Sequence, residues 1–324
     1  MLESVTTPQS ARTVGTPTPG DVDAAWSAVR RHLRPSPVDL GAGTVEEPVL
    51  KLESLQPTGS FKARGALNAL ASLDLGIRVV TASAGNHGLG VAFAARVLGR
   101  GATVVVATTA SRAKVDQLRR LGVDLVETGT SYDDAEAHAL GLAAEGAHFL
   151  SGYNDAAVIA GQGTIGLELD EQLQGPLTVV CGVGGGGLAS GLGLWASRRP
   201  DVRVVGVEAE VSTAVSAAVA AGHQVPVAVG ETLADGMAGN IEPGSVTVDL
   251  VTRHVDELVT VSEAEIRSGI RYLAGERGYV AEGAGAVPVA ALRAGKVAVR
   301  GRPVAVVSGR NIALPTLAAV LTRT

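Results

Sequence analysis

The sequence contains little cysteine, few aromatic residues and no apolar run long enough to cross a membrane. Cys181 is the only cysteine, which excludes a disulfide within the chain. No charged segment followed by an apolar stretch and a cleavage site indicates a secretory signal. Glycines, polar residues or charges interrupt each apolar stretch before it reaches the length of a transmembrane helix. We therefore expect a cytoplasmic protein without a membrane segment.

Basic residues are also few, and they do not cluster. Lysine and arginine number 27 against 32 aspartates and glutamates, for a net charge of -5. Without a basic patch the chain has no electrostatic footprint for nucleic acid or for an anionic membrane, so we expect a small-molecule partner. Chemistry that needs a free amine is restricted to four lysines: Lys51, Lys62, Lys114 and Lys296.

Short β-rich runs alternate with alanine-rich stretches of helix length along most of the chain. This alternation predicts an α/β fold with mostly parallel sheets covered by helices, because strands buried on both faces show as continuous apolar runs. The runs expected to form strands are Val49 to Leu52, Arg78 to Thr81, Thr103 to Ala107, Leu125 to Val126, Leu177 to Cys181, Arg203 to Val207, Leu258 to Val261 and Pro303 to Val307.

Composition also indicates how the chain is divided. Residues 1–20 are rich in serine, threonine and proline without an apolar period, so a mobile N-terminal extension is expected there. A first helix is expected to begin at Asp21. Glycines separate strand and helix units within 76–155, which is predicted to form a small domain. The flanking segments, 21–75 and 156–324, are predicted to form one large domain.

The segment Lys51–Ala66 runs from a strand, through a proline and glycine turn, into the start of a helix. It places Lys62 near a strand-to-helix corner, where α/β folds bind ligands. An isolated helical lysine is usually a solvated surface residue. Here Phe61 precedes the lysine and small residues follow it. In such a pocket the pKa of a lysine falls, and the amine becomes a nucleophile or a base.

The segment Cys181–Leu188 contains a run of glycines between a strand and a helix. Consecutive glycines let backbone N–H groups converge on an anion at a helix N-terminus, so the loop fits a phosphate. A flexible linker is the alternative, although linkers seldom join an apolar strand directly to a helix. The spacing departs from G-x-G-x-x-G, which makes a dinucleotide site a weaker match. Cys181 itself is expected to be a small core residue.

Two further polar segments follow strands. Ser83–Gly88 offers a hydroxyl, an amide and backbone N–H groups that fit a carboxylate, although serine and asparagine there are also ordinary helix caps. Ser308 follows the last strand, where a serine is usually a turn residue. Each of these segments is unspecific when taken alone.

Together, these motifs resemble a known family. The string Lys51–Ala66 is similar to the pyridoxal phosphate (PLP) lysine motif of fold-type II enzymes, and the chain resembles the short form of the threonine dehydratase and serine racemase group, without a regulatory domain. The resemblance extends over most of the chain after about residue 45. It implies a two-lobed, tryptophan synthase β-like fold, PLP as the cofactor, and Lys62 as the catalytic residue that holds it as a Schiff base.

The resemblance also implies roles for individual residues. Asn86 would contact the phenolic oxygen of the cofactor, and Ser308 its pyridine nitrogen. The phosphate would be held by Gly184, Gly185, Gly186, Gly187 and Leu188, with Phe61 and Gly236 also facing the cofactor. The residues expected on the substrate side are Ser83, Ala84, Gly85, Asn86, His87 and Tyr153.

The chain departs from the family pattern at three places. The family often has a His-Pro pair and then a smaller residue where this chain has Ser151–Asn154. The Tyr153 ring either only packs or faces the site, and a phenol that faces the site is expected to alter specificity. Arg310 replaces a small residue. Glu208 resembles a cation-binding carboxylate, but Ala214 replaces its expected partner. A solvated or capping glutamate is an equal alternative there, and no metal is predicted.

The resemblance implies a lyase that dehydrates and deaminates an L-hydroxy amino acid, such as L-threonine or L-serine, to a 2-oxo acid and ammonia. A racemase of the same fold is the first alternative, although Ala84 has no proton to give where a serine acts in racemases of this group. The others are a dehydratase for another β-hydroxy amino acid derivative, a PLP-binding protein without turnover, and a dinucleotide-dependent oxidoreductase. Relatives are commonly dimers, so a homodimer is expected.

Overall fold

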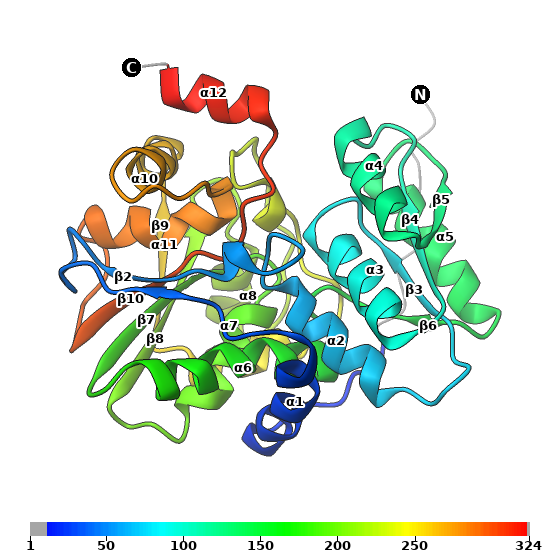
Figure 1. The fold of residues 1–324 in the computed structure, drawn as a ribbon, viewed down its shortest axis with the longest axis horizontal. Helices are drawn as coiled ribbons and strands as arrows, with labels where there is room; N and C mark the ends of the chain where they lie inside the picture. The colour runs from blue at the N-terminus through cyan, green and yellow to red at the C-terminus, as the bar shows by residue number, and fades with distance from the viewer. Residues whose placement is uncertain (1–11, 323–324) are drawn as a thin grey trace.

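Two β-sheets lie side by side in the computed structural model, which describes residues 12–322 (Figure 1). The larger sheet has six strands in the order β1-β2-β10-β7-β8-β9. Its strands are parallel except for the antiparallel pair β1 and β2. Their bounds are β1 (Val38–Asp39), β2 (Val49–Lys51), β7 (Leu177–Gly182), β8 (Val202–Ala209), β9 (Glu257–Val261) and β10 (Arg302–Val306).

The smaller sheet has four parallel strands in the order β5-β4-β3-β6. All four lie inside the range 76–155 predicted for the small domain, while the exact boundaries at 76 and 155 stay predictions. The strands are β3 (Val79–Ala82), β4 (Ala102–Val106), β5 (Asp124–Glu127) and β6 (His148–Phe149).

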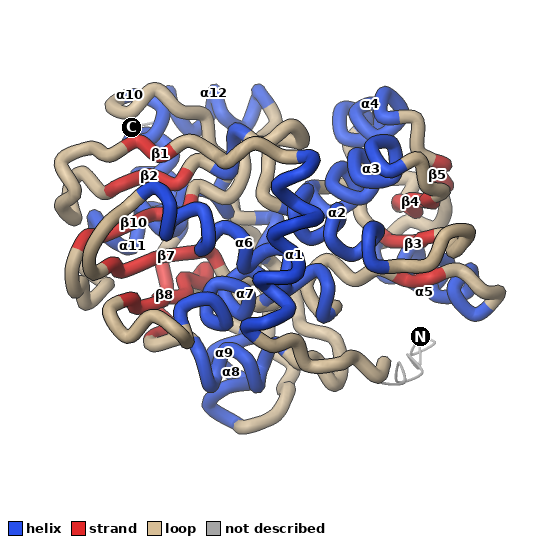
Figure 2. Tube along the Cα trace, turned by 60° about the horizontal axis from the view of Figure 1, so that its bottom comes forward, coloured by secondary structure: helices blue, strands red, loops and turns tan. Residues whose placement is uncertain are grey.

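Helices cover both faces of each sheet, and α1, α2 and α6 pack together between the two sheets (Figures 1 and 2). The α-helices are α1 (Pro19–His32), α2 (Lys62–Ser72), α3 (Asn86–Leu98), α4 (Arg112–Leu121), α5 (Tyr132–Ala144), α6 (Ala156–Gln172), α7 (Gly187–Ala196), α8 (Ala214–Ala221), α9 (Thr247–His254), α10 (Glu263–Gly275), α11 (Gly283–Arg293) and α12 (Leu314–Thr322), and two short 3-10 turns are η1 (Glu53–Leu55) and η2 (Asp235–Met237).

Each predicted apolar run forms a strand whose bounds differ from the prediction by two residues at most. In β7, Val179 and Cys181 face one core cluster while Val180 faces the other, so alternate residues are buried against helices on opposite sides. Two strands were missed, β1 and β6. Each has only two residues, too few for an alternating or apolar pattern.

The first helix begins earlier than the sequence predicted. It starts at Pro19 rather than at Asp21, because Thr18 accepts a hydrogen bond from the Asp21 backbone and the Asp21 carboxylate accepts one in return. Residues 1–11 of the predicted mobile extension lie outside the described residues. Within the rest of the extension, Arg12 contacts the body of the protein, and the mobility of this segment stays a prediction.

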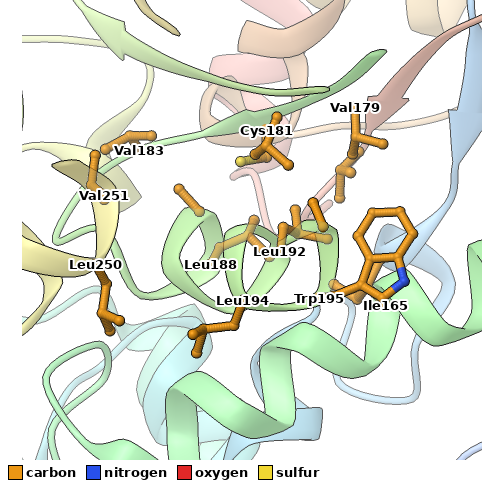
Figure 3. Close-up of a cluster of buried hydrophobic side chains, with 14 of the residues drawn as sticks. Ile165, Val179, Cys181, Val183, Leu188, Leu192, Leu194, Trp195, Leu250 and Val251 are labelled. Atoms are coloured by element: carbon orange, nitrogen blue, oxygen red, sulfur yellow. The ribbon is translucent and has the colours of Figure 1, made fainter. Parts of the chain in front are cut away.

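The core beneath the larger sheet supports the glycine segment. Leu188, Leu192 and Trp195 of α7 pack against Val179 and Cys181 of β7 (Figure 3). Cys181 is fully buried, and burial raises the pKa of its thiol to about 12, so it acts as a small core residue. Among residues 12–322, no helix combines the length and the apolar character needed to span a membrane.

Candidate active site

A cavity of about 720 Å³ lies where β3, β7 and β10 end and their loops lead onward. This is the edge at which parallel α/β sheets bind ligands. The cavity brings together every site residue that the sequence predicted: Phe61, Lys62, Ser83, Ala84, Gly85, Asn86, His87, Tyr153, Gly184, Gly185, Gly186, Gly187, Leu188, Gly236 and Ser308.

Lys62 is the first residue of α2 and reaches into this cavity. Its Nζ donates a 2.5 Å hydrogen bond to the carbonyl oxygen of Gly152 and lies 5.1 Å from the centre of the Phe61 ring. The loss of hydration on burial lowers the pKa of Lys62 to about 8. Because of this lowered pKa, a substantial fraction of the Lys62 amine is neutral near physiological pH. The Phe61 N–H donates to the Ser308 carbonyl oxygen, which connects the lysine segment to the end of β10.

The glycine loop has no room for side chains. A Cβ on Gly185 would lie 2.3 Å from Cγ of Tyr153. Gly186 has a φ of +86°, the left-handed region that glycine adopts without strain. Gly187 then begins α7, whose free N–H groups and dipole favour an anion. This cradle fits the phosphate of PLP.

Asn86 joins the loops of the two sheets through Glu282 and Asn311. Its Nδ2 donates to Glu282 Oε1 at 2.6 Å, and its Oδ1 accepts from Asn311 Nδ2 at 2.6 Å. Burial raises the pKa of Glu282 to about 7. Glu282 is not among the site residues that the sequence predicted, because an isolated glutamate before a helix shows nothing of a partner 196 residues away.

The segment Ser83–His87 forms the turn from β3 into α3. The Gly85 N–H donates to Ser83 Oγ at 3.2 Å. Burial, reinforced by the charge of Lys62, lowers the pKa of His87 to about 4, so its ring is neutral. Its Nε2 lies 3.0 Å from the carbonyl oxygen of Leu150, which can only accept, so Nε2 carries the proton.

Ser308 lies at the end of β10, and its Oγ donates to the carbonyl oxygen of Ala284 at 3.2 Å. The structure also explains the departure at Arg310. Its guanidinium donates to the carbonyl oxygen of Ser54, and its N–H donates to that of Gly59 at 2.9 Å. Arg310 thus holds the turn that precedes Lys62.

Tyr153 packs its ring on the glycine loop, and its hydroxyl oxygen accepts a 2.7 Å hydrogen bond from the Glu242 N–H. Several polar residues of this side of the cavity were missed from the sequence. Three of them lie on helix surfaces (Lys114, Tyr132 and Glu136), two lie between α8 and α9 (Asp235 and Glu242), and one follows β10 (Asn311). Tertiary packing brings them together.

Glu208 is used as a helix cap. Its carboxylate accepts from the Val215 N–H at 2.9 Å and from the Ser216 N–H at 3.1 Å, and it also accepts from the Ser216 hydroxyl. Of the two interpretations of this glutamate, the geometry favours the capping one. No group of three or more His, Cys, Asp or Glu within residues 12–322 is placed to hold a metal ion.

Comparison with curated proteins identifies close relatives of this chain. It is 46% identical over 272 residues to an L-threonine ammonia-lyase of Thermotoga maritima, a match that covers 82% of this chain and 67% of the relative. It is 37% identical over 302 residues to a putative threonine dehydratase of Sinorhizobium fredii, covering 90% of this chain and 91% of that protein.

Solved structures share the same fold. Processed threonine deaminase isoform 2 from Solanum lycopersicum superposes with a TM-score of 0.86 at 31% identity, covering 98% of this chain and 99% of that one. Maize serine racemase superposes with a TM-score of 0.86 at 27% identity, covering 94% and 97%. The predicted fold class, a two-lobed fold-type II architecture with mostly parallel sheets, is confirmed.

The family model described as pyridoxal-phosphate dependent enzyme matches residues 29–309, which include the lysine segment, the glycine loop and Ser308. The predicted cofactor agrees with this match, and the glycine cradle and the buried amine of Lys62 fit it. The chain belongs to the family of pyridoxal-phosphate dependent enzymes.

Proposed function

We propose that the protein is a PLP-dependent ammonia-lyase that converts an L-hydroxy amino acid, such as L-threonine or L-serine, to a 2-oxo acid and ammonia. One observation carries the proposal: the buried amine of Lys62, with its pKa lowered to about 8, faces a cavity between a glycine cradle and the Ser83–His87 loop. The threonine ammonia-lyase and threonine deaminase relatives support this reaction.

The bound cofactor would supply an electron-withdrawing ring that acidifies the Cα proton of an attached amino acid. Lys62 would hold the cofactor and then accept that proton at Nζ, which is neutral often enough for the task because of its lowered pKa. The Gly152 carbonyl, 2.5 Å from Nζ, orients the amine.

Backbone N–H groups of this chain would bind two anionic groups, the phosphate of the cofactor and the carboxylate of the substrate. The N–H groups of Gly184–Leu188 would hold the phosphate at the start of α7, and those of Ser83–His87 would hold the substrate carboxylate at the start of α3. Asn86 would contact the phenolic oxygen and the Ser308 hydroxyl the pyridine nitrogen. A neutral hydroxyl there leaves that nitrogen largely unprotonated, which favours prompt β-elimination.

Racemisation is the second candidate, because the similar structures include serine racemases. Ala84 lines the cavity and offers no proton to a substrate, so this chain lacks the acid/base that racemases of the group place there. Chiral analysis of recovered L-serine tests this alternative, and formation of D-serine faster than the oxo acid would favour it. Membership in the PLP family argues against the dinucleotide-dependent oxidoreductase.

The deciding experiment is a spectral screen of amino acids against the purified holoenzyme, with oxo acid release measured in parallel. We expect visible absorption of the bound cofactor and turnover in the wild type, and neither in Lys62→Ala. Lys296→Ala is the matched control, because Lys296 forms surface ion pairs with Glu210 and Glu265. A Lys62→Ala enzyme that still deaminates its substrate would overturn the proposal, and cofactor absorption without product would indicate a binding protein.

The proposal includes a homodimer that acts in the cytoplasm and does not bind nucleic acid or membranes. The net charge of -5 supports the lack of nucleic acid and membrane binding, and the single buried cysteine supports the cytoplasmic location. The homodimer rests on the resemblance to the family. Light scattering coupled to size-exclusion chromatography measures the number of subunits. A monomer at micromolar concentration would contradict the assembly.

A further inference from the structure

Arg12, in the segment before α1, reaches the rim of the cavity. Its Nε and one terminal nitrogen donate to both carboxylate oxygens of Glu242 at 3.0 and 2.9 Å, and that nitrogen also donates to the Asn154 carbonyl oxygen at 3.1 Å. The guanidinium lies 4.9 Å from the centre of the Phe149 ring of β6. One side chain thus contacts the small sheet, the segment after it, and the long loop between α8 and α9.

Glu242 is itself part of the cavity lining, next to Tyr153. Its carboxylate accepts from Ser151 Oγ at 2.9 Å, and its N–H donates to the Tyr153 hydroxyl at 2.7 Å. The Val246 N–H donates to Asn154 Oδ1 at 3.1 Å. We call the surface formed by Tyr153 and Glu242 the Tyr153–Glu242 wall. It joins residues 151–154 to residues 239–246, which meet through these hydrogen bonds, through Arg12 and through apolar packing of Tyr153 with Ile241 and Val246.

The ion pair is sheltered enough to matter energetically. The side chains of Arg12 and Glu242 are 25% and 19% exposed, so solvent screens the pair less than an ordinary surface pair. A bidentate guanidinium also fixes the orientation of the carboxylate. Without Arg12, Glu242 would carry an uncompensated negative charge into a cavity that binds anions.

We propose that Arg12 is a positioning residue of the substrate side, which holds the Tyr153–Glu242 wall in place and neutralises Glu242. The inference rests on the proposed function, since that function places the substrate against this wall. The hydrogen bonds of Arg12 go to Glu242 and to the Asn154 carbonyl oxygen, and not to the lysine segment or the glycine loop. We therefore expect its main effect on substrate binding.

The kinetic test compares Arg12→Ala with wild-type holoenzyme. We expect KM for the best amino acid substrate to rise roughly tenfold, because the wall loosens and the freed carboxylate repels that of the substrate. The value of kcat should stay within about twofold, and the cofactor absorption should be unchanged. Arg12→Lys, which keeps the charge but loses the fork, should recover part of the affinity. An unchanged KM, or an equal loss in kcat and cofactor retention, would overturn the proposal.

The double variant Arg12→Ala/Glu242→Gln separates charge from tethering. Glutamine keeps an acceptor for Ser151 but removes the unpaired charge, so KM should fall below that of Arg12→Ala alone. A KM higher than that of Arg12→Ala would show that the charge is not what Arg12 compensates.

Hydrogen exchange supplies a readout that does not depend on activity. In Arg12→Ala the amides of residues 239–246 should exchange faster, while those of residues 184–192 should not change. Arg30→Ala is the matched control, because Arg30 stacks on Trp26 of α1 at 5.5 Å. Unchanged exchange at 239–246 would overturn the proposal. Faster exchange in a protein without lyase activity would instead show that the proposed function, and not the tether, is wrong.

Discussion

Asn86 Nδ2 donates a 2.6 Å hydrogen bond to Glu282 Oε1, and this pair connects the start of α3 with the start of α11 across the cavity. Glu282 is 6% exposed, and burial raises its pKa from 4.5 to about 7. The folded protein therefore binds this proton more tightly than the unfolded chain does. The associated stability is fully present below pH 4.5 and is lost as the pH rises through 7.

We expect the free energy of unfolding of the apoprotein to drop between pH 5 and pH 8, with Glu282 contributing up to about 3 kcal/mol. Glu282→Gln keeps an oxygen for Asn86 and removes the titration, so its drop should be smaller. Urea unfolding at the two pH values measures the difference. Glu145→Gln, at an exposed position, should behave as wild type. An equal drop in Glu282→Gln would contradict the assignment.

The lowered pKa of Lys62 predicts how the uptake of PLP by the apoprotein depends on pH. The neutral amine is the nucleophile that captures the cofactor, so the rate at which apoprotein takes up PLP should rise with pH and level off near 8. Below that midpoint the rate should change about tenfold per pH unit. Recovery of visible absorption after mixing measures the rate, with N-acetyl-lysine as the reference amine. A rate that still rises above pH 9.5 would show that Lys62 is not desolvated.

Gly185 tests the cofactor cradle. A side chain there would meet the Tyr153 ring at 2.3 Å, so Gly185→Val should displace the ring or the phosphate and raise the dissociation constant of PLP at least about tenfold. Circular dichroism should show an intact fold. In Gly275→Ala, at the end of α10, the new methyl group meets nothing within 4 Å, and PLP affinity should not change. Unchanged affinity in Gly185→Val would refute the assignment of the loop.

Tyr153 is the residue where we expect specificity to depart from that of the relatives. The enzyme should catalyse β-elimination from L-threonine and L-serine at measurable but low rates. A better substrate is expected among other β-hydroxy amino acids or their derivatives. Tyr153→Asn removes the acceptor of the Glu242 N–H and changes the space beside the β-substituent, so kcat/KM ratios across a substrate panel should change rank. Tyr279→Phe, away from the cavity, serves as control. If L-threonine is best in both enzymes, Tyr153 has no specificity role.

The buried ion pairs of Arg64, a residue of α2, are expected to contribute to the stability of the fold. Arg64 is fully buried and pairs with Glu53 at 2.7 Å and with Glu168 at 2.8 Å. Arg64→Met leaves two buried carboxylates without this partner and should lower the free energy of unfolding by about 3 to 5 kcal/mol. Arg78→Met breaks an exposed pair with Asp124 and should cost less than about 1 kcal/mol. Urea unfolding of both apoproteins compares them, and equal losses would contradict this interpretation.

Local patterns predicted the strands and most of the site. A run such as Leu177–Gly182 is apolar because both faces of its sheet are covered, and that requirement is visible in a few consecutive residues. The glycine loop and the Lys62 segment are likewise contiguous, since a helix N-terminus and a close backbone approach are made by neighbouring residues. Local signals missed β1 and β6, which are too short for a pattern, and placed the start of α1 two residues late.

The sequence by itself determined the α/β fold class and the contiguous motifs, and the resemblance of those motifs to a known family implied the cofactor. Tertiary structure alone decided which isolated polar residues complete the cavity. Glu282 meets Asn86 across 196 positions, and Arg12 meets Glu242 across 230. Composition and periodicity do not reveal such pairs, because a polar or charged residue is well hydrated at any surface position and its local sequence does not depend on its partner. Only the packing of the two sheets determines which of these charges lose water and find a partner.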